Sequence, residues 1–564
     1  MKSIIKLVFS ILIICNYTFI YPQYQKEWQD IFSFLSNSSV SSVGVGSDNM
    51  GNLYIGGTAT LNSNNSDFLI IKYNSQGDTV WTRLYDINSE NTVLVKDFFV
   101  DSLGNCYLTG SSTTTSFSTA IVTIKFNSDG VLQFSSIYNT NSFSATAKSL
   151  IVDDDGSVLV LVSENTGLTL IKYNFDGSEV WTNNYVNDFA TMTPEKMVMD
   201  NNGFILVGGS MTNPNNFSQD FFVMKLNSFN GDSIWTQTYD RAGFDDYFSS
   251  ITVDNQGNIF IGGSANYAQN FLTSDFAVVK LNSDGQFQWA RFYNGNSDQR
   301  DEVIDIISDS DGNIFVGGNS YDPTFLSTVV LIKYSPTGDS LWAATFNGDS
   351  IIINSSVNNF KLNKVKRFGP DARFFGFTFN PFFPSPDLII SGIMAATATS
   401  PTGAFALILN TNSLLFENFI AEHVVNYNFF EALAILSLLN DLIIVGDAQR
   451  SLSSNIVIIT TKYKHSITNV ENLTNLLSDF TLDQNYPNPF NPYTKISWQS
   501  PVGSWQTLKV YDVLGNEVAI LVDEYKAAGN YSLEFNGGNL PSGVYIYKLI
   551  AGSYTSSKKM VLMK

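Results

Sequence analysis

The stretch DNQGNIFIGGSANYAQNFLTSDFAVVKLNSDGQFQWARFY, Asp254–Tyr293, contains every part of a unit that recurs along this chain. It begins with an Asp-x-x-Gly-Asn turn, continues with an aliphatic run that ends in Gly-Gly, and then has an apolar run that ends in Lys-Leu-Asn. An aromatic run around Trp289 follows. The runs are short, rich in β-branched and aromatic residues, and bounded by Gly, Asn, Asp or Ser, which is typical of β-strands.

The unit recurs eight times between Trp28 and about Tyr463, at a spacing of roughly 53 residues. A repeat of this length with several strands per unit predicts an all-β β-propeller, in which each sheet packs mainly on its neighbours. Eight units predict eight blades, and seven is the alternative because the seventh and eighth units are degenerate. The aromatic positions of the units are Trp28, Trp81, Phe134, Trp181, Trp235, Trp289, Trp342 and Phe416.

The phase of the repeat predicts how the ring closes. The last unit ends at Lys462-Tyr463 with no aromatic strand after it, whereas the strand around Trp28 precedes the first complete set. We therefore expect the N-terminal strand to complete the last blade. Pairing the two ends of the chain in one sheet would remove an exposed sheet edge.

The recurrent charged residues have a structural and a functional interpretation. Asp in an Asp-x-x-Gly turn can accept a backbone hydrogen bond, and Gly can take positive φ. A calcium-binding EF loop needs Gly at its sixth position, whereas Gly is the fourth residue here. Turn formation is therefore favoured, a structural calcium ion is the alternative, and no cofactor is predicted. We expect Arg83 and Arg291 to be structural, and the lysines to pair with Asp or cap a carbonyl, with an anion-binding ring as the alternative. These lysines are Lys72, Lys125, Lys172, Lys225, Lys280, Lys333 and Lys462.

The bulk composition excludes some functions. The net charge of −20 argues against binding to nucleic acid or to anionic lipid, because both need Lys/Arg-rich surface. The sequence has only two histidines, His423 and His465, and contains no H-E-x-x-H, G-x-S-x-G or P-loop motif. These observations favour a protein without catalytic activity.

Residues 1–23 have the pattern of a secretory signal peptide, with Lys2 and Lys6 before the apolar run Val8–Cys15. This run is too short to span a bilayer comfortably, and no later stretch predicts a membrane span. A lipoprotein cysteine at Cys15 is the alternative, although Ile13 and Ile14 precede it where small residues are expected. Cleavage near Gln23 would leave Cys106 as the only cysteine, which excludes an intrachain disulfide.

One segment of the repeat region is not explained by the repeat. Gly318 and Gly392, which end consecutive aliphatic runs, are 74 residues apart, against roughly 47 to 55 elsewhere. The extra segment, about Asn354–Asp387, is basic and rich in Phe and Pro. It is predicted to be a loop, which either packs over one end of the propeller or forms an interaction site for a partner or glycan. The candidate interaction residues are Lys364, Arg367, Phe374, Phe375, Phe382 and Phe383.

The last part of the chain has a different pattern. It begins with FTLDQNYPNPFNPYTKISW (Phe480–Trp498) and continues with about five alternating runs, with turns at Leu514-Gly515-Asn516 and Gly537-Gly538. This pattern predicts a small Ig-like β-sandwich. The predicted organisation is a signal peptide at 1–23, a propeller at 24–464, a linker at 465–479 and the sandwich at 480–564.

The sandwich resembles the type IX secretion system (type A) C-terminal sorting domain of Bacteroidetes-like bacteria, and the repeats resemble SBBP-type propeller repeats. The first resemblance implies export through the inner membrane, passage across the outer membrane by the type IX machinery, removal of the domain, and attachment to surface lipopolysaccharide or release. It rests on the motifs QNYPNPFNP, YDxLG, AGxY, SGVY and KMVLMK. The matching residues are Asn485, Pro487, Asn488, Pro489, Phe490, Asn491, Pro492, Tyr511, Asp512, Gly515, Gly529, Gly543, Tyr545, Lys559 and Lys564.

Together these features predict a secreted or surface-attached binding or scaffold protein without catalytic activity. We expect its ligand, a glycan or a protein, at the loop-bearing face or the central opening of the ring. The alternative is a glycan-active or other hydrolase that uses a pair of Asp or Glu residues. Two carboxylates converging about 5 to 10 Å apart would favour the hydrolase.

Overall fold

The computed structural model describes residues 23–564 except 35–37, 63–64, 88–91, 114–118, 141, 143, 166, 267–272, 296, 348–349, 356–358, 364–370, 381–386, 396–401, 411–415, 423–426, 439–440, 451–455, 467–480, 501–503, 527–528 and 552–553. Within the described ranges, the backbone alone is described for 23–25, 350–441, 449–450, 465–466, 504–505, 525 and 529–530. The chain divides into a compact unit Tyr21–Ser466 and a second unit that contains Ile467–Lys564. Each unit is described separately below.

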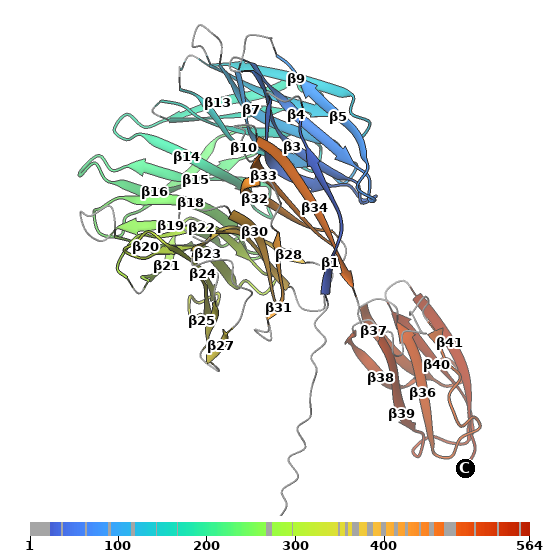
Figure 1. Ribbon diagram of the computed structural model, residues 1–564. Helices are drawn as coiled ribbons and strands as arrows, with labels where there is room; N and C mark the ends of the chain where they lie inside the picture. Colours follow the sequence, from blue (N-terminus) through green and yellow to red (C-terminus); the bar gives the residue numbers. More distant parts are fainter. Residues whose placement is uncertain are drawn as a thin grey trace, which may run out of the picture. The chain divides into compact units, whose positions relative to one another are not determined.

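The first unit consists of repeated antiparallel sheets in which consecutive strands are neighbours (Figure 1). The first sheets are β2 (Ser39–Ser47), β3 (Leu53–Asn62), β4 (Asn65–Tyr73) and β5 (Thr79–Tyr85); β6 (Thr92–Val100), β7 (Cys106–Thr113), β8 (Thr119–Phe126) and β9 (Leu132–Asn139); and β10 (Thr146–Val152), β11 (Val158–Ser163), β12 (Gly167–Tyr173) and β13 (Glu179–Val186). Two regular sheets follow, β14 (Met192–Met199), β15 (Phe204–Thr212), β16 (Gln219–Asn227) and β17 (Ser233–Tyr239); and β18 (Asp246–Val253), β19 (Ile259–Asn266), β20 (Ser274–Leu281) and β21 (Phe287–Tyr293).

The remaining sheets of this unit depart from the regular pattern. One sheet contains β22 (Asp301–Ser308), β23 (Ile314–Tyr321), β24 (Ser327–Tyr334), β25 (Ser340–Phe346), β26 (Ser350–Ser355) and β27 (Asn359–Asn363). The next contains β28 (Asp371–Asn380), β29 (Asp387–Ala395), β30 (Thr402–Asn410) and β31 (Phe416–Glu422). The last combines β32 (Tyr427–Leu438), β33 (Asp441–Arg450) and β34 (Ile456–Ser466) with β1 (Gln23–Phe32).

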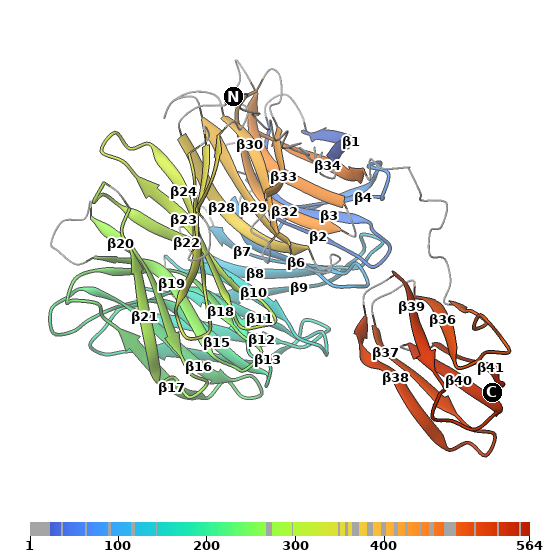
Figure 2. The same cartoon turned by 90° about the horizontal axis from the view of Figure 1, so that it is seen from below.

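The sheets form a closed ring. The first strand of each sheet contacts the first strand of the next, from β2 through β6, β10, β14, β18, β22, β28 and β32, and β32 contacts β2. Figure 2 shows the sheets following one another around a common centre, so that the orange strands β32–β34 lie beside the blue strands. A closed circuit of packed antiparallel sheets is the arrangement of a β-propeller.

The two ends of the ring unit pair as the phase of the repeat predicts. Strand β1 runs antiparallel to β34, with Trp28 opposite Lys462, and the prediction that the N-terminal strand completes the last sheet is confirmed. The contact between the last sheet and the first is of the same kind as the contact between the first sheet and the second. Trp28 packs on Gly77 in the next sheet, where a Cβ would lie 2.5 Å from the indole ring, and Trp81 packs on Gly130 in the same way. Both glycines have positive φ, so the turn needs them for conformation as well as for space.

The recurrent lysines hold neighbouring sheets together. Lys225 Nζ lies 2.9 Å from Asp200 Oδ2 in its own sheet and donates to the Ser283 carbonyl of the next sheet at 3.2 Å. The same ammonium group lies 4.6 Å from the centre of the Phe204 ring. Lys72, Lys280 and Lys462 likewise donate to carbonyls of the next sheet. The prediction that these lysines pair with Asp or cap a carbonyl is therefore confirmed.

The turn carboxylates and the repeated arginines also have structural partners. Asp254 Oδ1 accepts hydrogen bonds from the backbone N–H groups of Gln256 and Asn258, both at 2.9 Å, which confirms the predicted turn. Arg83 Nε and Arg291 Nε donate to turn carbonyls of the next sheet at 2.7 and 2.6 Å. Among the described residues, no group of three or more His, Cys, Asp or Glu side chains could hold a metal ion.

The segment 354–387 is not a single insertion. Strands β26 and β27 extend the β22–β25 sheet beyond its outer edge, and β28 is the first strand of the following sheet. Phe374 and Phe375 lie in β28, so the expectation that they belong to a loop was wrong. The seventh unit lacks the Asp-x-x-Gly turn between its first two strands, and its first strand was therefore read as part of the extra segment. Lys364, Arg367, Phe382 and Phe383 lie outside the described residues.

The second unit contains two sheets with one core between them. The smaller sheet has the order β35 (Thr481–Leu482), β36 (Tyr493–Ser500) and β39 (Gly529–Asn536). The larger has the order β38 (Glu517–Lys526), β37 (Ser504–Tyr511), β40 (Gly543–Ala551) and β41 (Tyr554–Leu562). Alternate residues of β36 and β40 are buried, as the period of a half-buried strand requires, and they meet in one cluster that includes Phe490, Trp498 and Tyr547.

Candidate functional site

A β-bulge recurs near the middle of the first strand of each sheet in the ring. The register between the first and second strands shifts at Ser42/Gly44, Val95/Asp97 and Pro194/Lys196, for example. In most sheets the shift lies opposite one or two glycines in the interior of the second strand. A Cβ at Gly57 would lie 2.0 Å from the Ser41 carbonyl oxygen, so glycine is needed for the close backbone approach at the bulge. The glycine pairs thus mark both a bulge and a backbone contact.

The bulges present charged and hydroxyl side chains at one level of the ring, because a bulge redirects the residues beside it. In the units that keep the Asp-x-x-Gly turn, the residue after the bulge lies four positions before the turn aspartate, as Asp97 does relative to Asp101 and Asp305 relative to Asp309. We call the polar residues at this level the axial cluster. They are Asp97 on β6, Lys148 on β10, Glu195 and Lys196 on β14, Ser250 on β18 and Asp305 on β22.

The axial cluster links sheets that are not neighbours. Lys196 Nζ lies 2.9 Å from Ser250 Oγ and 3.4 Å from Asp305 Oδ1, and Ser250 Oγ donates to the same carboxylate oxygen at 2.9 Å. The sheet that carries Ser250 stands between the sheets of Lys196 and Asp305. The Lys196–Asp305 contact therefore passes on the inner side of β18, which places both side chains at the axis of the ring.

Two further carboxylates belong to the axial cluster. Lys148 Nζ lies 2.8 and 2.9 Å from the two carboxylate oxygens of Glu195 on the next sheet. Asp97 accepts hydrogen bonds from the backbone N–H groups of Leu150 at 2.8 Å and Phe98 at 2.9 Å. Removal from bulk water raises the pKa of Asp97, and the two hydrogen bonds and the positive charge of Lys196 oppose this shift only in part.

The chemistry of the axial cluster follows from this pairing. Lys148 pairs with Glu195, and Lys196 pairs with Asp305 in a group that includes the Ser250 hydroxyl, so both ammonium groups have a carboxylate beside them. Asp97 accepts its hydrogen bonds from backbone N–H groups. The cluster offers fixed hydrogen-bond donors and acceptors to a polar ligand. Sequence reasoning missed these residues, although polar residues in otherwise apolar strands, four or five positions before the turn aspartate, were a usable signal.

In the sandwich, the predicted motif residues between Asn485 and Pro492 form a loop against the last strand. Asn488 acts as a substitute strand partner, because its Oδ1 accepts from Val561 N at 2.8 Å and its Nδ2 donates to the Lys559 carbonyl at 3.3 Å. Phe490 pairs with the same strand, through Phe490 N to the Val561 carbonyl at 2.9 Å, and its ring is buried in the core. The loop therefore covers the outer edge of β41, which would otherwise be an open sheet edge.

The remaining motif residues support this loop or form turns. Asn485 Nδ2 donates to Thr494 Oγ1 at 2.9 Å, and the Pro492 carbonyl accepts from Gly537 N at 2.8 Å. Asp512 Oδ1 accepts from two backbone N–H groups in the turn that contains Gly515, whose φ is +86°.

At the end of the chain, Tyr545 is buried and its hydroxyl donates to the Pro541 carbonyl at 2.8 Å. Lys564 Nζ donates to the Gly538 carbonyl at 2.6 Å. Tyr511 ends β37, and Gly529 and Gly543 begin β39 and β40. Most of the motif thus lies close to the edge that β41 forms.

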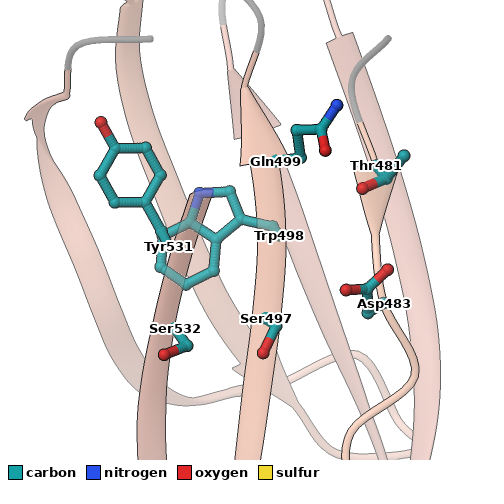
Figure 3. A pocket seen from close by; sticks show the side chains of 7 residues that line it. All are labelled: Thr481, Asp483, Ser497, Trp498, Gln499, Tyr531 and Ser532. Atoms are coloured by element: carbon teal, nitrogen blue, oxygen red, sulfur yellow. The ribbon is translucent and has the colours of Figure 1, made fainter. Parts of the chain in front are cut away.

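A shallow hollow of about 260 Å³ lies on the smaller sheet of the sandwich (Figure 3). Asp483, which follows β35, Ser497 on β36 and Ser532 on β39 line it. The buried Trp498 ring stacks on the Tyr531 ring, with 5.5 Å between the ring centres. Trp498 Nε1 donates to Gln506 Oε1 at 2.8 Å. Short polar side chains on the solvent face of a half-buried sheet are ordinary, so the hollow is not assigned a role.

Comparisons with known proteins give one family match. The secretion system C-terminal sorting domain family matches residues 484–563. A search of curated proteins gives no match to the chain.

Similar solved structures include the Dos1 propeller, with 11% identity, a TM-score of 0.43, and coverage of 78% of this chain and 96% of that chain. PorZ, an essential bacterial surface component of the type IX secretion system of Porphyromonas gingivalis, has 8% identity, a TM-score of 0.30, and coverage of 93% and 81%. A polysaccharide lyase of family PL25, an ulvan lyase, has 11% identity, a TM-score of 0.38, and coverage of 70% and 98%. Likenesses at these TM-scores carry no information on activity.

The family match and the motif geometry concern the same residues, because the matched segment contains the loop that covers β41. The resemblance predicted from the sequence is thereby confirmed, and the sorting domain implies an interaction with the type IX secretion machinery. Over the described ranges, no helix has the length and apolar character needed to cross a membrane. Residues 484–563 are a type IX secretion C-terminal sorting domain, and the chain is exported through that system to the cell surface or the extracellular space.

Proposed function

We propose that this protein is a binding or scaffold propeller without catalytic activity, and that its axial cluster binds a polar extracellular ligand. The observation that carries the proposal is the contact of Lys196 with Ser250 and Asp305, which joins three sheets at the axis. Fixed donors and acceptors at the centre of a rigid ring are suited to the hydroxyl groups of a glycan or the polar groups of a protein segment. Because each ammonium group is paired with a carboxylate, the cluster recognises hydrogen-bonding groups more than net charge.

We also propose that the ring has eight blades. The circuit of first strands from β2 to β32 passes through eight sheets among the described residues, and the β1–β34 pair closes it. This circuit supports eight blades over seven, since each of the degenerate units also contributes a sheet. The proposed organisation is a signal peptide at 1–23, the propeller at 24–464, a linker at 465–479 and the sorting domain at 480–564. In this proposal, the secretion machinery recognises the motif residues between Asn485 and Lys564.

The ligand-binding proposal can be tested with a glycan array and with Lys196→Met. This substitution keeps the length of the side chain and removes the positive charge, so the purified variant should lose binding to glycans that the wild-type protein retains. Ser283→Ala is a control, because Ser283 lies in the turn between β20 and β21 and its hydroxyl is not part of the axial cluster. Turnover of any arrayed glycan by the wild-type protein would contradict the noncatalytic proposal, and equal binding by Lys196→Met would contradict the axial site.

A hydrolase is the second candidate function, and one observation favours it. Burial raises the pKa of Asp97, and the positive charge of Lys196 acts on its carboxylate. The same lysine and Ser250 contact the carboxylate of Asp305 directly. Two carboxylates in different environments can act as acid and base. If this function is correct, Asp97→Asn and Asp305→Asn will each abolish glycan cleavage while binding persists. If the noncatalytic function is correct, no cleavage will be measured in any of the three proteins.

The export route has a separate test. Deletion of 480–564 should retain the protein in the periplasm, where immunoblotting of cell fractions would detect it. Appearance of the truncated protein outside the cell would contradict the role of the sorting domain. The proposal that Lys364, Arg367, Phe382 and Phe383 form an interaction site is kept, and it can be tested by replacing these residues with Ser in the same binding assay.

A further inference from the structure

Two phenylalanines on one face of the ring have a backbone conformation that rarely suits them. Phe217, in the loop between β15 and β16, and Phe325, in the loop between β23 and β24, both have φ of +62°. Their side chains are 79% and 63% exposed. A bulky residue at positive φ is strained, and Gly or Asn would fit the same turn better. Neither packing nor turn formation therefore explains why these positions carry an aromatic ring.

The loops that hold these rings are internally bonded. Phe217 N donates to the Asn213 carbonyl at 2.8 Å, and Asn213 N donates to the Ser218 carbonyl at 2.7 Å. Phe325 N donates to the Asp322 carbonyl at 2.9 Å, and Asp322 Oδ1 accepts from two backbone N–H groups. The backbone beneath each exposed ring is thus held by hydrogen bonds, so little backbone entropy would be lost when a partner covers the ring.

The two loops belong to the same face of the ring, which we call the loop face. It consists of those connections after the second strand and after the fourth strand of a sheet that the structure describes. Asn216 Nδ2 of the Phe217 loop donates to the Gly243 carbonyl in the connection between β17 and β18, and Gln219 N donates to Asp245 Oδ1. A third exposed ring, Phe189, lies in the connection between β13 and β14 and is 80% exposed.

The loop face is acidic. The connections that adjoin the exposed rings carry five carboxylates against two arginines, and both arginines already have acidic partners. The buried Asp246 nearby has a pKa raised to about 8, first by removal from water and then also by the charges of Asp240 and Asp220. The five carboxylates are Asp188, Asp240, Asp245, Asp298 and Asp322.

The chain itself shows how this face accommodates a guanidinium group. Arg241 lies 3.9 Å from the centre of the Phe292 ring, and its Nη2 is 2.7 Å from Asp275 Oδ2. A planar guanidinium can stack on an aromatic ring and pair with a carboxylate at the same time, which an ammonium group does less well. Exposed aromatic rings beside carboxylates therefore complement arginine in particular.

We propose that the described loops of this face that hold Phe189, Phe217 and Phe325 form a docking surface for an arginine-containing, positively charged polypeptide segment of a protein partner. Phe217 and Phe325 contact the guanidinium groups and apolar side chains of the segment, and the surrounding carboxylates supply the charge complementarity. This surface does not use the axial cluster, so the proposal stands or falls independently of the function proposed above.

The experiment uses the full chain and a fluorescein-labelled synthetic peptide of alternating Arg and Leu, with Lys–Leu and Glu–Leu peptides of equal length for comparison. Fluorescence polarisation should detect binding of the Arg–Leu peptide that weakens as salt increases, because exposed charges are screened. The Lys–Leu peptide should bind more weakly and the Glu–Leu peptide not at all. Failure of the Arg–Leu peptide to bind would overturn the proposal.

The double variant Phe217→Asn/Phe325→Asn tests the role of the two rings. Asn tolerates positive φ, so the loops should keep their conformation and Tm should be unchanged or higher. Affinity for the Arg–Leu peptide should fall by about tenfold or more, as expected for central aromatic contacts.

A matched control is Phe229→Asn. Phe229 is 84% exposed at the opposite end of β16, and its substitution should leave the affinity unchanged. Equal peptide binding by the wild-type protein and the Phe217→Asn/Phe325→Asn variant would overturn the proposal. So would loss of neutral-glycan binding in that variant without loss of peptide binding. Lys196→Met should leave peptide binding intact, which separates this surface from the axial cluster.

Discussion

The ring and the sorting sandwich are stabilised differently, although both are built from antiparallel strands. In the ring, apolar clusters combine residues of neighbouring sheets, such as Leu161 on β11 with Val207 on β15 and Phe222 on β16. In the sandwich, one cluster lies between two sheets, and the motif loop closes it with Phe490. Stability is thus spread over repeated joints in the ring and concentrated in a single core in the sandwich. A single substitution should therefore have different consequences in the two units.

The largest effect is expected for Phe490→Ala. Removal of a buried Phe side chain costs about 3–5 kcal/mol, and a domain of this size loses about 4–8 °C of Tm per kcal/mol. We expect the calorimetric transition of the sandwich to disappear or to shift far downward, while that of the ring stays in place. The matched ring substitution Phe222→Ala should shift the ring transition by fewer degrees, because the ring is larger. A smaller shift for Phe490→Ala than for Phe222→Ala would contradict the comparison.

A smaller but still large effect is expected for Lys225→Met in the ring. The substitution leaves the buried Asp200 carboxylate without its cation and removes a hydrogen bond to the next sheet. Breaking a buried ion pair costs about 3 kcal/mol or more. Denaturant unfolding of the ring should show this loss, and the double variant Asp200→Asn/Lys225→Met should recover part of it. If the double variant is less stable than Lys225→Met, the ion pair is not the source of the effect.

The same turn in both units gives a direct comparison of two glycines. Gly130 and Gly515 both have positive φ, but a Cβ on Gly130 would lie 2.9 Å from Arg83 Nε and 3.0 Å from Trp81, whereas Gly515 has open space around it. Gly515→Ala should cost about 1 kcal/mol for conformation alone. Gly130→Ala should cost roughly 1–3 kcal/mol more, since it also pushes neighbouring sheets apart. Equal losses of unfolding free energy for the two variants would show that neighbouring sheets can move apart at Gly130 without a loss of stability.

The last comparison concerns pH and a buried carboxylate of the ring. Burial raises the pKa of Asp246 from 3.8 to about 8, so between these values the folded ring keeps a proton that the unfolded chain releases. The contribution of this group to stability therefore falls as pH rises through that window, and it is lowest above pH 8.

Asp246→Asn should consequently raise the Tm of the ring at pH 8 and leave it almost unchanged near pH 4. The exposed control Asp188→Asn should show no such difference. Thermal unfolding followed by circular dichroism at several pH values would check this, and a pH-independent change in Tm for Asp246→Asn would contradict it.

Much of the ring could be predicted from sequence because its signals are local. The Asp-x-x-Gly turns, the lysine at the end of each third strand and the aromatic outer strand each act within one unit or on the adjacent one. The missing aromatic strand after Tyr463 was enough to predict the β1–β34 pair. The prediction was wrong at the seventh unit, which lacks the Asp-x-x-Gly turn between its first two strands. Phe374 and Phe375 were therefore assigned to a loop and not to β28.

The candidate sites were less accessible to sequence reasoning. Asp97, Lys196 and Asp305 are far apart in sequence and belong to different sheets, and only the closure of the ring brings their side chains to one axis. In the sequence, Phe217 and Phe325 do not differ from ordinary loop residues, because their exposure and positive φ are properties of the folded chain. The motif was recognised, but its contact with β41 was not.

The sequence by itself determined the strands and turns of the regular units, the order of the units and the presence of the sorting domain. Each of these depends on residues close in the chain, through strand period, turn conformation or a contiguous motif. The tertiary structure alone decided which side chains share the ring axis, which aromatic rings remain exposed, and that Asn488 and Phe490 cover the last strand. These are contacts between distant segments, and they depend on how many sheets close the ring and in what register.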